Sequence, residues 1–320
     1  MKILVAVDVS HADKNAAPGS VGAANAAVKQ KDLSTSGELD QLASTLTAMI
    51  DLQGAETTLL YVQEELPSYE AVLRTQGGEE INLERELENA ARQQLEQIGE
   101  KFRAAGAQVK VDIAHGPGAY MIEQVARDIK ADLTVVSAGS HAGEQFLIGS
   151  TSQYVVRHAP SSVLVLRAPK QAQAKKIEKI LIAVDGSDAC LQAVRKAVDK
   201  LNLDKATVKI NLVHIVVLSP LVASFTPQSF ITALEENLLM EGEVALANAK
   251  KLFAENGYKA IDIELGKGNA AAEIIKMQTK YGSDLIVIGS QGKSGVKHFL
   301  MGHVANRIVT HATAPTVVAR

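Results

Sequence analysis

Residues 2–8 read KILVAVD and residues 179–185 read KILIAVD, and this repeated stretch decides the fold. Each stretch is a short apolar run that ends in Asp, as expected of a strand buried on both faces. Three further pairs of segments repeat in the same order: ADLTVV (131–136) with SDLIVI (283–288), FLIG (146–149) with FLMG (299–302), and VVRHAPSSVLVLR (155–167) with IVTHATAPTVVAR (308–320). The chain therefore contains two copies of one domain.

The repeat predicts a first domain at 1–167, a linker at 168–176 and a second domain at 177–320. The linker is polar and rich in Ala and Gln. The first copy is longer because of an insertion over about 10–38, which is rich in Ala, Gly, Ser, Asn and Lys and poor in large apolar residues. We expect this insertion to form a long or partly disordered loop.

Strand and helix patterns alternate along the second copy. The expected strands cover about residues 177–184, 207–217, 260–265, 284–289 and 315–320. The expected helices begin near Ser187, run from Pro227 to Asn256, and cover 271–281 and 304–311, with N-cap and stop residues at their ends. The first copy has the same order, with its second helix at about 82–105. This alternation is typical of an α/β domain whose five-stranded parallel sheet is covered by helices on both faces.

Composition excludes several classes of function. Apolar residues make up 47% of the chain and charged residues 22%, which is ordinary for a soluble globular protein. The net charge of −3 provides no basic field for nucleic acid or an anionic membrane. The N-terminal apolar run, Ile3 to Val7, is too short for a signal peptide or a membrane span. The single cysteine, Cys190, fits a reducing compartment, so we expect a cytoplasmic protein.

Motifs of catalysis and metal binding are missing from the sequence. The loop after the first strand, VDGSDA (184–189), is not a GxGxxG fingerprint, and the chain has neither a Walker A loop nor a G-x-S-x-G elbow. His298 and His303 are five residues apart, which does not place them on one helical face. We therefore predict no catalytic residue and no metal site.

The loop after the fourth strand of the second copy reads GSQGKSGVKHFLMGHVAN (289–306). Glycines let successive backbone N–H groups turn toward one anion, and a helix that begins at the last glycine adds further donors. Lys293 and Lys297 supply positive charge. The loop is either an anion cradle or a plain glycine-rich turn between strand and helix.

KILIAVDGS, DLIVIGSQG and the spacing G-x2-G-x9-G together resemble the universal stress protein family, over both copies and nearly the whole chain. The resemblance implies a Rossmann-like sheet of strand order 3-2-1-4-5 in each copy. Many members pair through the last strand, which implies that the two copies form an internal pseudo-dimer. One subset of the family binds ATP through G-x2-G-x9-G-[ST].

Carried over residue by residue, the resemblance implies a site for ATP or a related adenine nucleotide, with or without Mg²⁺, mainly in the second copy. Asp185 would approach the ribose and adenine. Side chains beside the base would be those of Ala183, Val184 and Ile215. The phosphates would lie against Gly289, Ser290, Gly292, Gly302, His303 and Val304. His303 departs from the family pattern, because Ser or Thr is usual there.

The first copy has a weaker match to the same pattern. Its expected site residues are Asp8 and Val62 beside the base and Gly139, Gly149 and Ser150 at the phosphates. Two alignments are open, one in which Ser137 replaces the first glycine and one in which Gly139 keeps the spacing and Val136 replaces that glycine. Glu144 would repel phosphates. The insertion begins at the mouth of this pocket and acts either as a lid or plug or as a tolerated surface loop.

Three functions follow from this sequence. The first is a nucleotide-binding stress-response protein whose conformation or partner affinity changes on binding, with slow hydrolysis at most. The second is a nucleotide-free interaction scaffold with vestigial pockets. The third is a slow ATPase or autophosphorylating protein that uses His303 as the phosphoryl acceptor. The sequence leaves open which regulatory protein is the partner and whether two chains form a homodimer.

Overall fold

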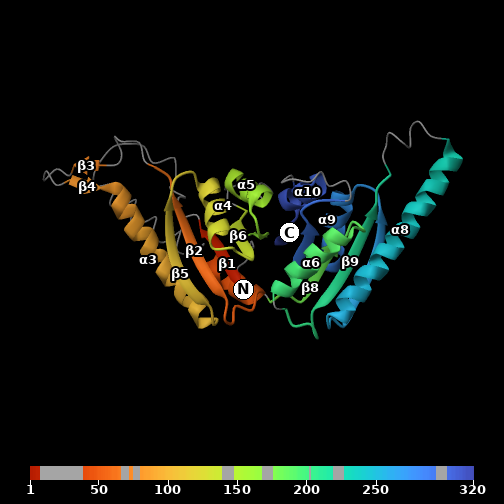
Figure 1. Ribbon diagram of the computed structural model, residues 1–320, viewed down its shortest axis with the longest axis horizontal. Coiled ribbons are helices and arrows are strands. Elements are labelled where there is room, and N and C mark those ends of the chain that lie inside the picture. Colours follow the sequence, from red (N-terminus) through yellow and green to blue (C-terminus); the bar gives the residue numbers. More distant parts are fainter. Residues whose placement is uncertain are drawn as a thin grey trace.

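The computed structural model describes residues 1–7, 39–65, 72–74, 80–138, 148–167, 176–201, 203–218, 227–292 and 301–320. The predicted insertion over 10–38 and nearly all of the predicted linker lie outside the described residues. Two similar lobes stand side by side, and the last strands of both lobes lie at the centre (Figure 1).

The described strands form one ten-stranded sheet and one short hairpin. The first copy contributes β1 (Lys2–Val7), β2 (Glu56–Gln63), β5 (Gln108–His115), β6 (Leu133–Ser137) and β7 (Ser162–Leu166). The second copy contributes β8 (Lys179–Ala183), β9 (Lys209–Val216), β10 (Ala260–Lys267), β11 (Leu285–Gly289) and β12 (Thr316–Ala319). The sheet order is β10-β9-β8-β11-β12-β7-β6-β1-β2-β5, which is 3-2-1-4-5 within each copy and confirms the predicted order. The hairpin pairs β3 (Val72–Arg74) with β4 (Glu80–Asn82), and the sequence did not predict it.

Helices cover both faces of the sheet, as predicted. They are α3 (Leu83–Ala104), α4 (Gly118–Asp128), α5 (Ser150–His158), α6 (Asp188–Lys200), α8 (Gln228–Glu255), α9 (Ala270–Tyr281) and α10 (His303–His311). Residues 39–49 are also helical. Successive strand residues enter opposite cores, so Val5 packs on the side of α3, α6 and α8 whereas Leu4 packs on the side of α4, α5, α9 and α10. Burial on both faces explains the continuous apolar runs of the central strands.

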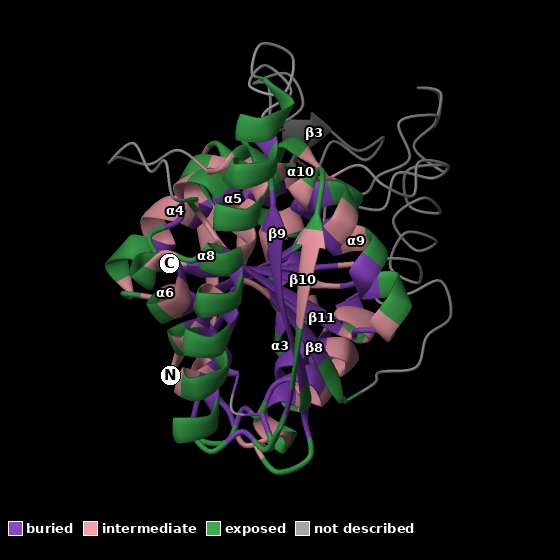
Figure 2. Ribbon diagram, turned by 90° about the vertical axis from the view of Figure 1, so that its right-hand side faces the viewer, coloured by how far each residue is buried: buried purple, intermediate pink, exposed green. Residues whose placement is uncertain are grey.

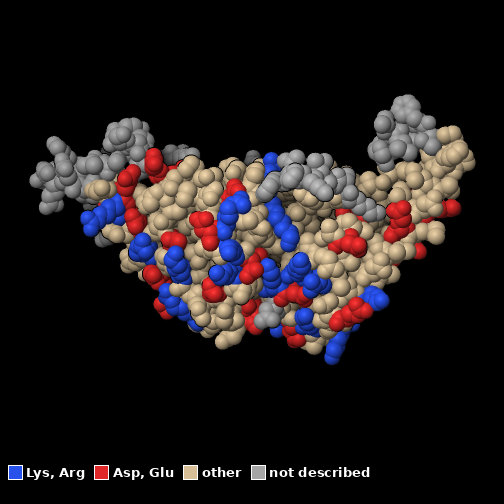
Figure 3. Space-filling view, viewed as in Figure 1, with Lys and Arg blue, Asp and Glu red and all other residues tan. Residues whose placement is uncertain are grey.

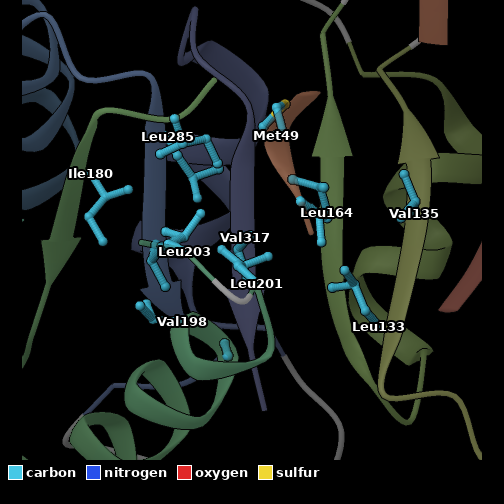
Figure 4. Close-up of a cluster of buried hydrophobic side chains, with 14 of the residues drawn as sticks. Met49, Leu133, Val135, Leu164, Ile180, Val198, Leu201, Leu203, Leu285 and Val317 are labelled. Atoms are coloured by element: carbon cyan, nitrogen blue, oxygen red, sulfur yellow. The ribbon is translucent and has the colours of Figure 1, made fainter. Parts of the chain in front are cut away.

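The two copies join through an antiparallel pair formed by β7 and β12. Leu164 is paired with Val317, its own counterpart in the other copy, and both side chains are fully buried (Figure 4). Each of the two hydrophobic cores contains residues of both copies. The copies therefore form the predicted internal pseudo-dimer, whose pseudo-twofold axis passes through this central pair.

Two equivalent arginines, one in each copy, donate hydrogen bonds to the end of a helix in the other copy. Arg320, at the end of the second copy, donates to the carbonyls of Val156 and Arg157 near the end of α5, at 2.5 and 3.0 Å. Arg167, at the end of β7, donates to the carbonyls of Val309 and Thr310 near the end of α10. A cation at a helix C-terminus satisfies carbonyls that the helix leaves unpaired and opposes its dipole. Each copy thus holds the end of a helix that belongs to the other copy.

Candidate functional site

Asp185 lies two residues after the end of β8, at the carboxyl edge of the sheet where α/β folds bind ligands. Its Oδ1 accepts hydrogen bonds from the backbone N–H and the hydroxyl of Ser187, at 2.9 and 2.7 Å. Ser187 is also the N-cap of α6 and accepts from the N–H of Cys190 at 3.2 Å. The carboxylate is therefore held in one orientation by the start of α6. Its other oxygen, Oδ2, is buried, and within the described ranges no group makes a hydrogen bond of normal geometry to it; the thiol of Cys190 lies near the carboxylate.

One glycine of the predicted cradle, Gly292, lies beside this carboxylate, and Gly302 lies beside Gly292. A Cβ on Gly292 would lie 3.8 Å from Oδ2 of Asp185. A Cβ on Gly302 would lie 3.6 Å from the carbonyl oxygen of Ser290 and 3.8 Å from the backbone N of Gly292. The N–H of Gly302 donates to the carbonyl of Ser290 at 2.8 Å, which closes the two ends of the loop. The predicted residues Asp185, Gly292, Ser290 and Gly302 therefore form one group in the structure.

Gly302 is the N-cap of α10 and offers no capping side chain. The first turn of a helix has unpaired N–H groups and a partial positive charge, so it suits an anion. His303 and Val304, the first two helical residues, are both exposed. The sequence places Lys293, Lys297 and His298 in the same loop, but these residues lie outside the described part of the chain.

The residues predicted beside the base are mostly buried. Val184 belongs to one hydrophobic core and Ile215 to the other, so their side chains lie on opposite faces of the sheet. A Cβ on Gly266 would lie 2.7 Å from Cδ1 of Ile215, which shows how closely that side chain is packed. Ala183 is half-buried at the end of β8. At the carboxyl edge of the sheet, a ligand would therefore meet chiefly backbone atoms and the half-buried side chain of Asp185.

Two buried residues next to the site were not among the predicted site residues: Cys190, which lies beside Gly289, and His214, which lies beside Val184. The Sγ atom of Cys190 would lie 2.9 Å from a Cβ on Gly289, which explains in steric terms why glycine occupies that position. The Nδ1 atom of His214 lies 2.9 Å from the carbonyl oxygen of Val184 and ties the end of β9 to the end of β8. The motif NLVHIVV (211–217) was the available signal for His214, since it places a polar residue inside an apolar strand.

Burial of Cys190 against the nearby Asp185 raises the pKa of the thiol to about 12. Because the thiolate is the reactive form, we expect the native thiol to react with a disulfide reagent at pH 8 at least about a hundredfold more slowly than the unfolded chain. The measurement is the rate of thiol modification with and without urea, and Cys190→Ser gives the background. A native rate within a few-fold of the unfolded rate would contradict the burial of this side chain.

The structure decides between the two alignments of the first copy. The N–H of Ser290 donates to Ala319 and the N–H of Ala138 donates to Leu166, the matching residue of the first copy. Likewise, the N–H of Gly302 donates to the carbonyl of Ser290 at 2.8 Å, and the N–H of Gly149 donates to the carbonyl of Ala138 at 3.2 Å. Ala138 thus takes the place of Ser290, and the residue before it, Ser137, takes the place of Gly289. The loop of the first copy is therefore one residue shorter than that of the second.

The remaining predicted residues of the first copy are placed only in part. Gly149 is the N-cap of α5, no atom of the described residues lies within 4 Å of the position of a Cβ there, and Ser150 is exposed beside it. Val62 is half-buried on β2. Asp8, Gly139 and Glu144 lie outside the described residues.

Within the described ranges, no group of three or more His, Cys, Asp or Glu side chains is placed to hold a metal ion. A search of the same ranges finds no helix long and apolar enough to cross a membrane.

Comparison with known proteins supports the resemblance seen in the sequence. The model of the universal stress protein family matches residues 33–167 and 176–320. The universal stress protein MJ0531 of Methanocaldococcus jannaschii is 35% identical over 144 residues, which are 45% of this chain and 82% of its own. The universal stress protein YxiE of Bacillus subtilis is 32% identical over 148 residues, which are 44% of this chain and 98% of its own. A solved universal stress protein from Archaeoglobus fulgidus has a TM-score of 0.57 at 15% identity, covers 100% of this chain and 96% of its own, and has the same fold.

Proposed function

The chain belongs to the universal stress protein family, and from this premise we propose that its second copy binds ATP or a related adenine nucleotide as a regulatory ligand in a stress response. Binding would change the conformation of the protein or its affinity for a regulatory partner. We place this activity in the cytoplasm, a proposal supported by the single cysteine of the chain.

The observation that carries the proposal is the buried Oδ2 atom of Asp185 beside Gly292, to which no described residue makes a hydrogen bond of normal geometry, the thiol of Cys190 being a weak donor near the carboxylate. A buried carboxylate oxygen without a hydrogen bond is costly, so such an atom in a native protein requires an explanation. A ribose hydroxyl or an adenine amino group would donate to this oxygen, in agreement with the role that the family resemblance gives to Asp185. The second carboxylate oxygen stays fixed by Ser187, so the acceptor is oriented before the ligand arrives.

The phosphates would then lie between the glycine loop and the start of α10. A Cβ on Gly292 or Gly302 would already lie 3.6–3.8 Å from neighbouring atoms, so a larger side chain there would crowd a phosphate, and the first turn of α10 would offer its unpaired N–H groups to it. The imidazole of His303 would supply a donor where other family members have a hydroxyl. Any Mg²⁺ would be held by phosphate oxygens and water, because the described residues contribute Asp185 rather than a cluster of acidic ligands.

We propose one working site per chain. Ser137 in place of Gly289 puts a side chain where the second copy has none, and the shorter loop changes the approach to the first turn of α5. The first copy would therefore serve mainly as the structural partner of the second.

The test is mass spectrometry of the nucleotide released by denaturing the purified full chain, together with calorimetry of added Mg-ATP and other adenine nucleotides. We expect about one nucleotide to be bound per chain. Two per chain would overturn the assignment to a single copy. No release and no binding heat would overturn the nucleotide proposal and leave a scaffold of paired copies.

A further inference from the structure

The outer face of α8 carries a line of exposed residues, most of them apolar. The side chains of Phe230, Met240 and Val244 are 67%, 64% and 60% exposed. The complete line, here called the α8 stripe, consists of Phe230, Ala233, Asn237, Met240, Val244 and Ala247, all of them exposed. Figure 2 looks directly at this helix and shows its outward side as mainly exposed.

The α8 stripe is separate from the face by which α8 packs on the sheet. That face consists of Ile231, Gly242, Leu246, Ala249 and Phe253, all of them buried. Gly242 brings the helix close to the sheet, since a Cβ there would lie 2.6 Å from Leu265 and 2.9 Å from His214. The inner face therefore makes the buried contacts between α8 and the sheet, and the α8 stripe takes no part in them.

The equivalent helix of the first copy shows that the fold does not require an apolar outer face. Four buried positions of α3 match four buried positions of α8 at a constant offset, among them Ala91 with Gly242 and Phe102 with Phe253. The same match places exposed polar residues of α3 at the positions of the last four stripe residues: Glu86, Asn89, Gln93 and Glu96. Charges of both signs cover the side of α3, whereas the side of α8 is mostly uncharged, with scattered acidic residues and basic residues toward its lower end (Figure 3). The apolar stripe is therefore specific to the second copy.

The spacing of the α8 stripe identifies the kind of surface that fits it. Its residues alternate at intervals of three and four, which is the a/d spacing by which one helix packs along another in a coiled coil. An a/d seam is a narrow apolar line along a helix, whereas a helix that packs on a sheet has a wider apolar face. A second helix is therefore the complementary partner.

The charges beside the α8 stripe indicate which kind of helix would pack against it. The flanking e and g positions between Phe230 and the first basic residue, Lys250, are occupied by three acidic residues, one apolar residue and one amide: Leu234, Glu236, Glu241, Glu243 and Asn248. If two copies of α8 paired in parallel, Glu236 would face Glu241 of the other copy; in the antiparallel arrangement it would face Glu243. Like charges at these positions oppose pairing. Lysine or arginine at the flanking positions of a partner would instead attract the carboxylates of Glu236 and Glu243.

From this geometry we infer that the α8 stripe is a docking surface for an amphipathic helix of another protein, with an apolar seam flanked by basic residues. The nucleotide site takes no part in this contact, so the inference stands independently of the proposed function. Such a surface provides a place at which a regulatory partner is engaged.

The test uses a synthetic amphipathic peptide of about three heptads, with Leu at the a and d positions and Lys at the e and g positions. Its binding to the full chain is measured by fluorescence anisotropy. One control peptide has Glu in place of Lys, and another has the same composition in scrambled order.

The test variant combines Met240→Asn with Val244→Gln, which gives α8 the residues that α3 has at the matching positions. The variant adds no charge, so any loss of binding reports on the apolar seam alone. The matched control combines Asn89→Gln with Gln93→Asn, which changes the same two positions on α3 and keeps them polar.

We expect the basic peptide to bind the unaltered chain and to bind the α8 variant at least tenfold more weakly. The α3 control should keep its affinity, and binding should weaken as salt is added. All substituted positions are exposed, so the unfolding midpoint of either variant should change little. Equal binding of the acidic or scrambled peptide, or undiminished binding by the α8 variant, would overturn the inference. Self-association of the unaltered chain that the α8 variant abolishes would also overturn it, because the stripe would then be covered by a second copy.

Discussion

Gly302→Leu is expected to abolish nucleotide binding by the second copy while the protein remains folded. Gly302 has φ near −61°, which any residue adopts, so the substitution brings no backbone strain. Its Cβ would lie 3.6 Å from the carbonyl oxygen of Ser290 and 3.8 Å from the backbone N of Gly292, and we expect the rest of the leucine side chain to occupy the proposed phosphate position. Calorimetry with Mg-ATP should show at least about a hundredfold loss of affinity, which corresponds to about 3 kcal/mol.

The matched control for this variant is Gly149→Leu in the first copy. Gly149 is also the N-cap of its helix and has φ near −62°, and the part of the chain that the structure describes places no atom within 4 Å of its Cβ position. With one working site in the second copy, this variant should bind as the unaltered protein does. Unchanged binding by Gly302→Leu would place the nucleotide elsewhere. Loss of binding in Gly149→Leu alone would assign the site to the first copy.

Much of the fold could be predicted because the central strands are buried on both faces. Residues such as Ile180 and Leu181 enter opposite cores, and this double burial produces the apolar run KILIA that the sequence displays in closely similar form in both copies. The β3–β4 hairpin had no comparable signal. Its strands are three residues long and belong to a separate two-stranded sheet, so neither length nor an apolar run distinguishes them from a loop.

Asp185 and the glycine loop of the candidate site could be predicted from the sequence, whereas the buried residues beneath them could not. Asp185 and the glycines were recognisable because a strand end and a glycine spacing are local features of the sequence. The packing of Cys190 against Gly289 depends on how α6 lies over β11, and no local pattern expresses that distance. The register of the first loop was ambiguous for a similar reason: only the hydrogen bonds of Ala138 to neighbouring elements distinguish the two alignments.

Val317→Asp is expected to have the largest effect on stability, because Val317 lies at the centre of the join between the copies. The side chain is fully buried opposite Leu164, and β12 is flanked by β7 and β11. A carboxylate placed there would lose its hydration with no basic partner in the surrounding apolar core. The expected loss is about 4 kcal/mol or more of the free energy of unfolding. Urea unfolding followed by circular dichroism measures it.

Two control variants separate the charge from the position. Val317→Thr keeps the shape of the side chain and adds a hydroxyl, so it should cost about 1–3 kcal/mol. Val217→Asp introduces the same charge at a side chain that is 53% exposed, and it should change stability by less than about 0.5 kcal/mol. Because each hydrophobic core contains residues of both copies, Val317→Asp should destabilise the two copies together in one transition. A variant that unfolds at the midpoint of the unaltered protein would show that β7 and β12 are not paired in solution.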